Sequence, residues 1–219
     1  MQTEGVGADM IYQSIKRGID FVLALLAMII LLPVFLFFAI AIKAETRGPV
    51  FFKQKRIGIH KKYFMIYKFR TMRTDTPKDV PTHQLKNPEQ YITKLGRFLR
   101  KTSLDELPQL INIVKGDMAF VGPRPALWNQ TDLMEERDKH GANDVLPGLT
   151  GWAQINGRDE LEIPVKAKLD GEYVKRMSFC FDIRCLLGTV FAVLRSDGVV
   201  EGGTGVLQQE KGEKTAKTE

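Results

Sequence analysis

An unbroken apolar segment, residues 21–42, constrains the fold of this chain more than any other feature of its sequence. No charged or strongly polar side chain occurs within it, and roughly 20 such residues suffice for a helix to span a bilayer. The segment is too long for the apolar region of a cleaved signal peptide, and no small-residue cleavage site follows it. It therefore predicts a helix that anchors the chain in a membrane.

The charges around this segment and a proline within it predict that it does not simply cross the bilayer. Lys16 and Arg17 precede it, and five further Lys and Arg residues follow between positions 43 and 56. Basic flanks favour the cytoplasmic side, so both ends prefer the same face of the membrane. Pro33 removes a backbone donor and clashes with the preceding turn, which kinks a helix. We expect a re-entrant helix-break-helix with its break at Pro33; a single span is the alternative.

The net charge of +6 is unevenly distributed. Residues 43–101 hold 16 Lys and Arg against 4 Asp and Glu, so the rest of the chain is acidic. A concentrated basic region beside an apolar segment fits an anionic lipid surface and phosphate ligands. Nucleic acid is the competing interpretation, but the membrane anchor and the few aromatic residues after Phe69 argue against it. We therefore expect membrane lipids as partners and no nucleic acid.

The remaining pattern predicts an α+β domain that is mainly helical with a small β-hairpin. The hairpin strands are expected at 49–52 and 63–67, around a turn at 58–62. Helices are expected at 95–99, 107–114, 128–139, 165–175 and 183–194. The last of these has apolar residues at helical spacing, which suit either core packing or an amphipathic helix in the membrane interface. Residues 73–88 are polar, contain prolines and read as a loop.

These features divide the chain into four parts. We expect a flexible N-terminus at 1–15, a re-entrant membrane helix at 16–45, a cytoplasmic domain at the membrane interface at 46–206, and a disordered tail at 207–219. Both termini are expected to be cytoplasmic.

Two adjacent carboxylates, Asp105 and Glu106, are candidates for chemistry. A cluster of cations precedes them: Arg97, Arg100 and Lys101. Acids beside cations stay ionised, and the cations can hold phosphate. A carboxylate near a helix N-terminus would have a low pKa, and Asp105 there would be a poor base but a competent nucleophile toward phosphorus. Ser103 and Glu106 also have the spacing of a capping box, in which the acid serves the helix alone.

Arg124 lies between Pro123 and Pro125, which restrict the backbone on both sides. A guanidinium fixed in this way suits bidentate contact with phosphate or a planar base, and a rigid surface turn is the alternative. Residues 147–158 form a second ordered, glycine-rich loop.

These motifs in this order resemble the bacterial sugar transferases, monotopic phosphoglycosyl transferases that start polyprenol-linked glycan assembly. The residues that carry the resemblance are 48–58, 67–72, 103–110, 115–118, 121–125 and 149–158. The similarity runs from about residue 16 to about residue 200. It matches the small form of the family, the catalytic core without an added multi-span domain.

The resemblance implies an enzyme of the bacterial inner membrane, with its catalytic domain in the cytoplasm. It would move a sugar-1-phosphate from a UDP-sugar to undecaprenyl phosphate and release UMP, the first membrane step of glycan and glycoconjugate biosynthesis. Asp105 matches the nucleophile that forms an aspartyl-phosphosugar intermediate in a ping-pong mechanism. Glu106 matches its partner, which activates or positions the polyprenol phosphate. The resemblance also implies Mg2+ near Asp105, where it would offset the charge between carboxylate and diphosphate.

Other residues acquire roles from the same resemblance. Arg100 matches an arginine that holds phosphate, and Arg124 an arginine implicated in nucleotide binding. A general phosphate- or lipid-facing role is expected for three further substrate-binding candidates: Arg56, Lys68 and Arg70.

One position departs from the family pattern. Many members carry Ser-Pro at the membrane break, where the hydroxyl bonds a freed carbonyl, but here the pair is Leu32-Pro33. Re-entrant and spanning topologies therefore both stay open. The small size and the tail after residue 200 resemble forms that use N-acetylated sugars. The sequence does not identify the sugar, the glycan pathway or the oligomeric state, and a homo-oligomer is one of the open alternatives.

A second hypothesis from another class is a single-span scaffold whose basic domain binds anionic lipid or a partner. In that case the two acids would be helix caps, and the termini would lie on opposite sides of the membrane.

Overall fold

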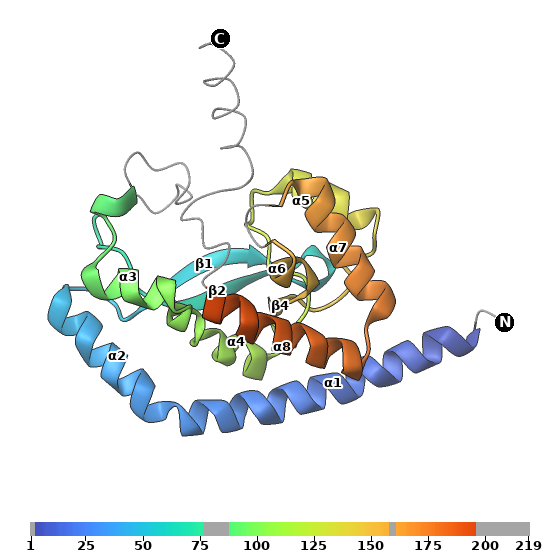
Figure 1. The fold of residues 1–219 in the computed structure, drawn as a ribbon, viewed down its shortest axis with the longest axis horizontal. Coiled ribbons are helices and arrows are strands. Elements are labelled where there is room, and N and C mark those ends of the chain that lie inside the picture. The colour runs from blue at the N-terminus through green and yellow to red at the C-terminus, as the bar shows by residue number, and fades with distance from the viewer. Residues whose placement is uncertain (1–2, 77–87, 158–160, 196–219) are drawn as a thin grey trace, which may run out of the picture.

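The computed structural model describes residues 3–76, 88–157 and 161–195 (Figure 1). Its helices and strands, in chain order, are α1 (Thr3–Ile30), α2 (Leu32–Glu45), β1 (Phe51–Ile57), β2 (Tyr63–Phe69), α3 (Lys94–Lys101), α4 (Gln109–Lys115), β3 (Ala119–Val121), α5 (Thr131–Asp138), β4 (Gly148–Thr150), α6 (Trp152–Ile155), α7 (Ile163–Arg176) and α8 (Phe179–Arg195). Short 3-10 turns occur at Ile59–Lys61, Pro88–Gln90 and Leu104–Glu106. The chain is mainly helical with a small hairpin, as predicted. Most of the loop expected at 73–88 and all of the tail expected at 207–219 lie outside the described residues.

The apolar segment forms two helices, α1 and α2, which run along one side of the molecule and meet at a bend (Figure 1). The two axes turn by 61° around Leu31, two residues before Pro33. Pro33 lies in the first turn of α2, where a helix needs no N–H donor. Among the described residues no single helix is long and apolar enough to cross a membrane, whereas this bent pair is, by length and composition. α1 begins at Thr3, well before residue 16.

Each helix of the bent pair buries one side in the domain and exposes the other. Ala24 of α1 packs in a cluster with Ile66 of β2 and Ile113 of α4. Phe38 of α2 packs in another cluster with Phe69 at the end of β2. The opposite sides expose large apolar side chains: Phe21, Val22, Leu23, Leu25, Leu26, Ile29, Ile30, Leu32, Leu36, Phe37 and Ile40. The segment is therefore part of the domain core and also its largest apolar surface.

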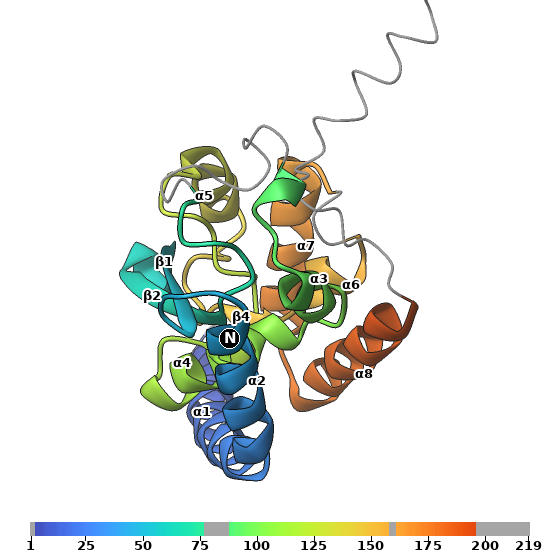
Figure 2. The ribbon, with the colours of Figure 1, turned by 90° about the vertical axis from the view of Figure 1, so that its left-hand side faces the viewer.

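β1 and β2 form the predicted antiparallel hairpin, with Phe51 opposite Phe69 and Ile57 opposite Tyr63. Both strands are longer than the sequence predicted. In β1 the additional residues include four consecutive polar ones, 53–56, which lack the apolar character by which a strand is recognised in a sequence. The hairpin is seen beside α4 and above α1 in the view of Figure 2. Asn112 of α4 fastens the two elements, since it accepts from Tyr67 N at 3.0 Å and donates to the Met65 carbonyl at 2.8 Å.

A second pairing, between β3 and β4, was not predicted. The two short strands are parallel, and Gly122 N donates to the Thr150 carbonyl at 2.8 Å. The chains approach so closely that a Cβ on Gly148 would lie 2.1 Å from Gly122 N, so glycine is required there. This pairing brings the start of the expected 147–158 loop against the Gly122–Pro125 turn.

The five helices that the sequence predicted in the domain, α3, α4, α5, α7 and α8, are present within a few residues of their expected bounds. α6 was not predicted, because it forms within the expected 147–158 loop. α5 and α7 lie side by side, and α8 follows α7 after a short connection (Figure 1). α8 buries Phe181 and Cys185 in a cluster with Tyr173. Its other side exposes Phe179, Ile183, Leu186, Leu187, Val190 and Phe191. α8 therefore packs in the core on one side, as one of the two alternatives expected, and its other side is apolar and exposed.

Candidate active site

The two acidic residues lie in a tight turn between α3 and α4. Ser103 adopts a left-handed backbone with φ of 56°, which reverses the chain after α3. Leu104–Glu106 then form a 3-10 turn, and Leu107 and Pro108 keep helical angles up to the start of α4. The Ser103 side chain makes no capping hydrogen bond, and its N–H donates to the Arg100 carbonyl. The capping-box alternative is therefore wrong.

Glu106 is held between two cations from distant parts of the chain. Its Oε1 accepts from Lys68 Nζ of β2 at 2.7 Å and from Arg124 Nη2 at 2.7 Å. Burial alone would raise the pKa of this carboxyl, but Arg124 and Lys68 together outweigh burial and hold the pKa well below its usual range. Glu106 is therefore a firmly ionised group and a weak proton acceptor.

Asp105 is buried next to Glu106, and within the described part of the chain its nearest cation is further away than those of Glu106. Its Oδ2 lies 3.9 Å from Lys68 Nζ, and its residue is 8% exposed. Burial raises the pKa of Asp105, and the charges of Lys68 and Arg100 offset this in part. The sequence prediction of a low pKa was wrong, because the burial of this carboxyl outweighs the positive charges around it. Neighbouring acids whose pKa values are pushed apart are typical of catalytic pairs.

Of the three cations that the local sequence suggested, Arg100 is the one whose charge acts on Asp105 in the structure. Arg97 pairs with Glu89 at an exposed site, 3.3 Å away, and Lys101 is exposed. Arg100 turns its Nε to Thr71 Oγ1 at 2.9 Å. This contact requires a close approach of α3, since a Cβ on Gly96 would lie 2.0 Å from the Thr71 carbonyl oxygen.

Lys68 binds Glu106, but the sequence pattern around Asp105 gave no indication of this contact. It precedes Glu106 by 38 positions in the chain, and only the hairpin brings the two together. Asn112, which no motif singled out for this role, holds the β2 backbone at Tyr67, the residue before Lys68.

The loop that carries Arg124 is fixed at two backbone carbonyls. Arg137 Nη2 donates to the Arg124 carbonyl at 2.9 Å, and Arg56 Nη1 donates to the Pro125 carbonyl at 3.0 Å. The Arg124 side chain leaves this braced loop to reach Glu106. Two flanking prolines and two carbonyl contacts thus limit its direction, in agreement with the sequence prediction.

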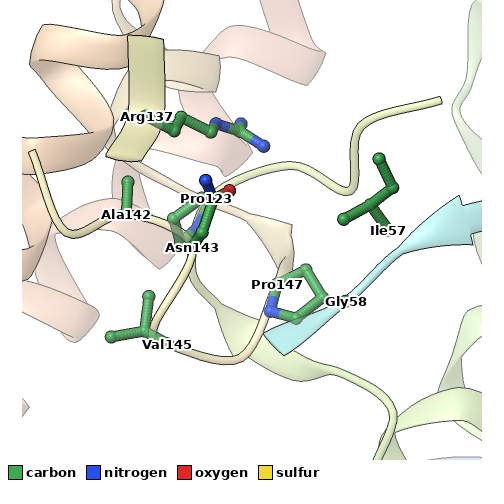
Figure 3. Close-up of a pocket in the computed structure, with 8 residues that line it drawn as sticks. All are labelled: Ile57, Gly58, Pro123, Arg137, Ala142, Asn143, Val145 and Pro147. Carbon is green, nitrogen blue, oxygen red and sulfur yellow. The ribbon is translucent and has the colours of Figure 1, made fainter. Parts of the chain in front are cut away.

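A small hollow lies behind this loop (Figure 3). Its volume of about 10 Å³ admits at most one water molecule, so it is too small for a nucleotide. It is lined by Ile57, Gly58, Pro123, Arg137, Ala142, Asn143, Val145 and Pro147.

Two of the predicted substrate-binding arginines make structural contacts instead of joining the acids. Arg70 is buried, and its guanidinium donates to the Arg47 carbonyl at 2.7 Å and the Thr46 carbonyl at 2.8 Å. Arg56 braces the Arg124 loop and donates to Gln54 Oε1 at 2.8 Å. The structure therefore brings together Asp105, Glu106, Lys68, Arg100 and Arg124.

The described residues contain no group of three or more His, Cys, Asp or Glu side chains that could hold a metal ion. Asp105 is nevertheless suited to contribute one ligand, because it is a buried carboxylate with no described cation closer than 3.9 Å. Mg2+ is commonly bound by one or two carboxylates together with substrate phosphates and water, which fits a single protein ligand here.

The sequence matches a family described as bacterial sugar transferase over residues 11–196. The Bacillus subtilis protein named "Uncharacterized sugar transferase EpsL" is 42% identical over 185 residues, which cover 84% of this chain and 90% of that protein.

Two longer relatives have names that state a reaction. The Escherichia coli "UDP-glucose:undecaprenyl-phosphate glucose-1-phosphate transferase" is 41% identical over 184 residues, 81% of this chain and 39% of that protein. The Aeromonas hydrophila "UDP-N-acetylgalactosamine-undecaprenyl-phosphate N-acetylgalactosaminephosphotransferase" is 34% identical over 196 residues, 86% of this chain and 45% of that protein. This chain thus spans less than half the length of either.

Proposed function

This chain belongs to the bacterial sugar transferase family, and we propose that it is a membrane-bound phosphoglycosyl transferase. The reaction is transfer of a sugar-1-phosphate from a UDP-sugar to undecaprenyl phosphate, with release of UMP. The longer relatives named for this reaction differ in their sugar, glucose in one and N-acetylgalactosamine in the other, so the sugar stays open.

The observation that carries this proposal is the unequal surroundings of the two acids. Glu106 is neutralised by two cations at 2.7 Å, whereas the cation nearest to Asp105 among the described residues is 3.9 Å away. Asp105 is thus the carboxylate left available for chemistry. Lys68, Arg100 and Arg124 supply the positive charge that a diphosphate requires when it approaches two anions.

In the first step a carboxylate oxygen of Asp105 attacks the phosphorus next to the sugar. The bond between this phosphorus and the bridging oxygen breaks, and UMP leaves with the electron pair. The product is an acyl phosphate that links the Asp105 carboxyl to the sugar phosphate. A carboxylate with an incompletely compensated charge is suited to this attack.

In the second step a phosphate oxygen of undecaprenyl phosphate attacks the same phosphorus and frees the Asp105 carboxylate. The second pKa of a phosphate monoester is about 6, so the attacking oxygen of the acceptor is mostly deprotonated at neutral pH. A strong general base is therefore unnecessary. The low pKa of Glu106 supports a positioning role, in which its carboxylate keeps Lys68 and Arg124 aimed at the phosphate.

Mg2+ is the proposed cofactor, with Asp105 as its protein ligand. When bound, it would offset the charge between carboxylate and diphosphate and polarise the phosphoryl oxygens. Asp105 would be the ligand that the protein supplies to the ion, and Lys68, Arg100 and Arg124 would hold the diphosphate beside it.

Contacts at both ends of the apolar segment support a re-entrant topology. Near its start, Lys16 pairs with Asp182 of α8, and Arg17 Nη1 donates to the Ile113 carbonyl at 2.8 Å. At its end, Arg70 Nη1 donates to the Arg47 carbonyl at 2.7 Å. Both ends are thus tied to the same folded domain, which a straight span with its ends on opposite faces would not allow.

The exposed apolar sides of α1, α2 and α8 support attachment to a lipid surface, because soluble monomers rarely leave so many large apolar side chains in water. We propose the inner face of the bacterial cell membrane, with the catalytic domain and both termini in the cytoplasm. A lipid-linked acceptor would then reach the site from the membrane.

The test is UMP release from UDP-glucose, UDP-galactose, UDP-N-acetylglucosamine and UDP-N-acetylgalactosamine, with Mg2+, with and without undecaprenyl phosphate. We expect turnover on at least one sugar that depends on the acceptor and is abolished in Asp105→Asn. Glu135→Gln, at an exposed carboxylate of α5, is the matched control and should retain full activity. Full activity of Asp105→Asn, or no UMP from any sugar with folded protein in lipid, would refute the proposal.

A further inference from the structure

One buried amide beside the acids has no partner for either of its polar atoms. Gln109, at the start of α4, is 1% exposed. Its Oε1 and Nε2 make no hydrogen bond to any residue that the structure describes. Buried polar groups are almost always paired, so an orphan pair of donor and acceptor in a candidate active site requires an explanation.

The position of Gln109 places it on the side of the chain that carries the acids. The backbone from Leu104 to Lys115 continues through helical angles at Leu107 and Pro108. In such a run, residues three and four positions apart are neighbours on one face. Gln109 is three residues after Glu106 and four after Asp105.

The next buried amide along α4, Asn112, is hydrogen-bonded within the fold and provides a comparison with Gln109. Asn112 is fully buried, yet it accepts from Tyr67 N and donates to the Met65 carbonyl and to Asp117 Oδ2. Gln109 has none of these contacts, although it is equally enclosed. The residues that the structure describes therefore leave the Gln109 amide without a hydrogen-bond partner.

We infer that Gln109 is a specificity-determining residue that hydrogen-bonds a hydroxyl of the donor's sugar. This inference rests on the proposed function. A sugar hydroxyl both donates and accepts, so one hydroxyl satisfies both orphan atoms. Phosphate oxygens only accept, and Lys68, Arg100 and Arg124 already provide charged donors for them. The sugar is the group attached to the phosphorus that Asp105 attacks, so it must pass close to this face.

A site that pairs a substrate hydroxyl discriminates strongly, because the wrong substrate leaves the protein's polar atoms unpaired. Replacing the amide by a side chain of similar shape without hydrogen-bonding groups should therefore weaken discrimination among sugars. It should not weaken the free protein, because a buried amide without partners only costs stability.

The test compares Gln109→Met with wild type in lipid, using the same four UDP-sugars. We expect the ratio of kcat/KM between the best and second-best sugar to fall at least tenfold. In an Asp105→Asn background, which cannot react with the donor, UDP-sugar should raise Tm more than UDP does, and this difference should vanish when Gln109→Met is added. The Tm of the free variant should be unchanged or higher.

Two controls separate this role from a structural one. Asn112→Leu removes a paired amide and should lower Tm. Gln154→Met makes the same chemical change at a second buried, unpaired amide, on α6 beside Gly151, and should leave sugar selectivity unchanged.

Unchanged selectivity in Gln109→Met, a loss of Tm comparable to that of Asn112→Leu, or an equal change in Gln154→Met would overturn the inference while wild type remains active. Wild-type protein inactive on every sugar would remove the proposed function as well, so the two failures are distinguishable.

Discussion

The buried ion pair between Arg137 and Asp170 links the stability of the domain to the geometry of the site. Arg137 Nη2 and Nε donate to Asp170 Oδ2 at 2.6 and 2.8 Å, and the two side chains are 5% and 1% exposed. The same Nη2 holds the Arg124 carbonyl at 2.9 Å. Loss of Asp170 would therefore leave a charged guanidinium buried beneath the Arg124 loop.

We predict that Asp170→Ala destabilises the protein by about 3–5 kcal/mol, the usual cost of leaving one partner of a buried pair uncompensated. For a chain of this size each kcal/mol lowers Tm by about 2–4 °C, so the shift should be roughly 6–20 °C. UMP release should also fall, because the Arg124 loop loses a fixed support.

The assay is thermal unfolding followed by intrinsic fluorescence in a constant lipid or detergent, with UMP release measured well below Tm. The double variant Asp170→Leu, Arg137→Met is the informative control. It removes both charges, so it should recover much of the Tm but not the support of Arg124. A Tm shift below about 2 °C for Asp170→Ala, or a double variant no better than the single one, would refute the reasoning.

Three further predictions follow from individual contacts. Glu106→Gln removes the anion between the two site cations and should lower UMP release about a hundredfold or more at unchanged fold, measured by kinetics and circular dichroism; activity within a few fold of wild type would count against its positioning role. Gly96→Ala forces a Cβ against the Thr71 carbonyl oxygen and should cost about 1–3 kcal/mol in thermal unfolding, since backbone cannot yield as a side chain does; an unchanged Tm would show that α3 is placed differently. The hydrogen bond from Lys61 lowers the pKa of Asp138, so this group stabilises the fold above its unfolded pKa of about 3.9 and loses that contribution as pH falls through the folded pKa. Asp138→Asn should therefore show a shallower loss of Tm on acidification, and an identical pH profile would contradict the assignment.

Local sequence patterns predicted the individual helices and strands of this fold better than they predicted which of these elements pack against each other. The hairpin, α4 and α8 follow from period and turn residues, and Pro33 predicted the bend. The parallel pairing of β3 and β4 could not be predicted, because three-residue strands have no period and their contact spans a long stretch of chain.

For the candidate site too, features that depend on neighbouring residues were predictable from sequence, and features that depend on distant residues were not. The adjacent acids and the restrained Arg124 were evident from sequence, since each depends on neighbouring residues. Their electrostatics were not, because the cation that matters for Glu106 comes from β2, and because burial raises the pKa of Asp105. Arg70 illustrates the converse, because this cation of a basic motif is buried and its guanidinium is bound by backbone carbonyls just after α2.

The most direct test of the central claim is the intact mass of the protein after incubation with its UDP-sugar and Mg2+, in the absence of undecaprenyl phosphate. The account predicts a covalent gain equal to one sugar phosphate on the peptide that contains Asp105. This gain should disappear when the polyprenol phosphate is added and be absent from Asp105→Asn. Acceptor-dependent UMP release by a wild-type protein that never gains this mass, or the same gain in Asp105→Asn, would contradict it.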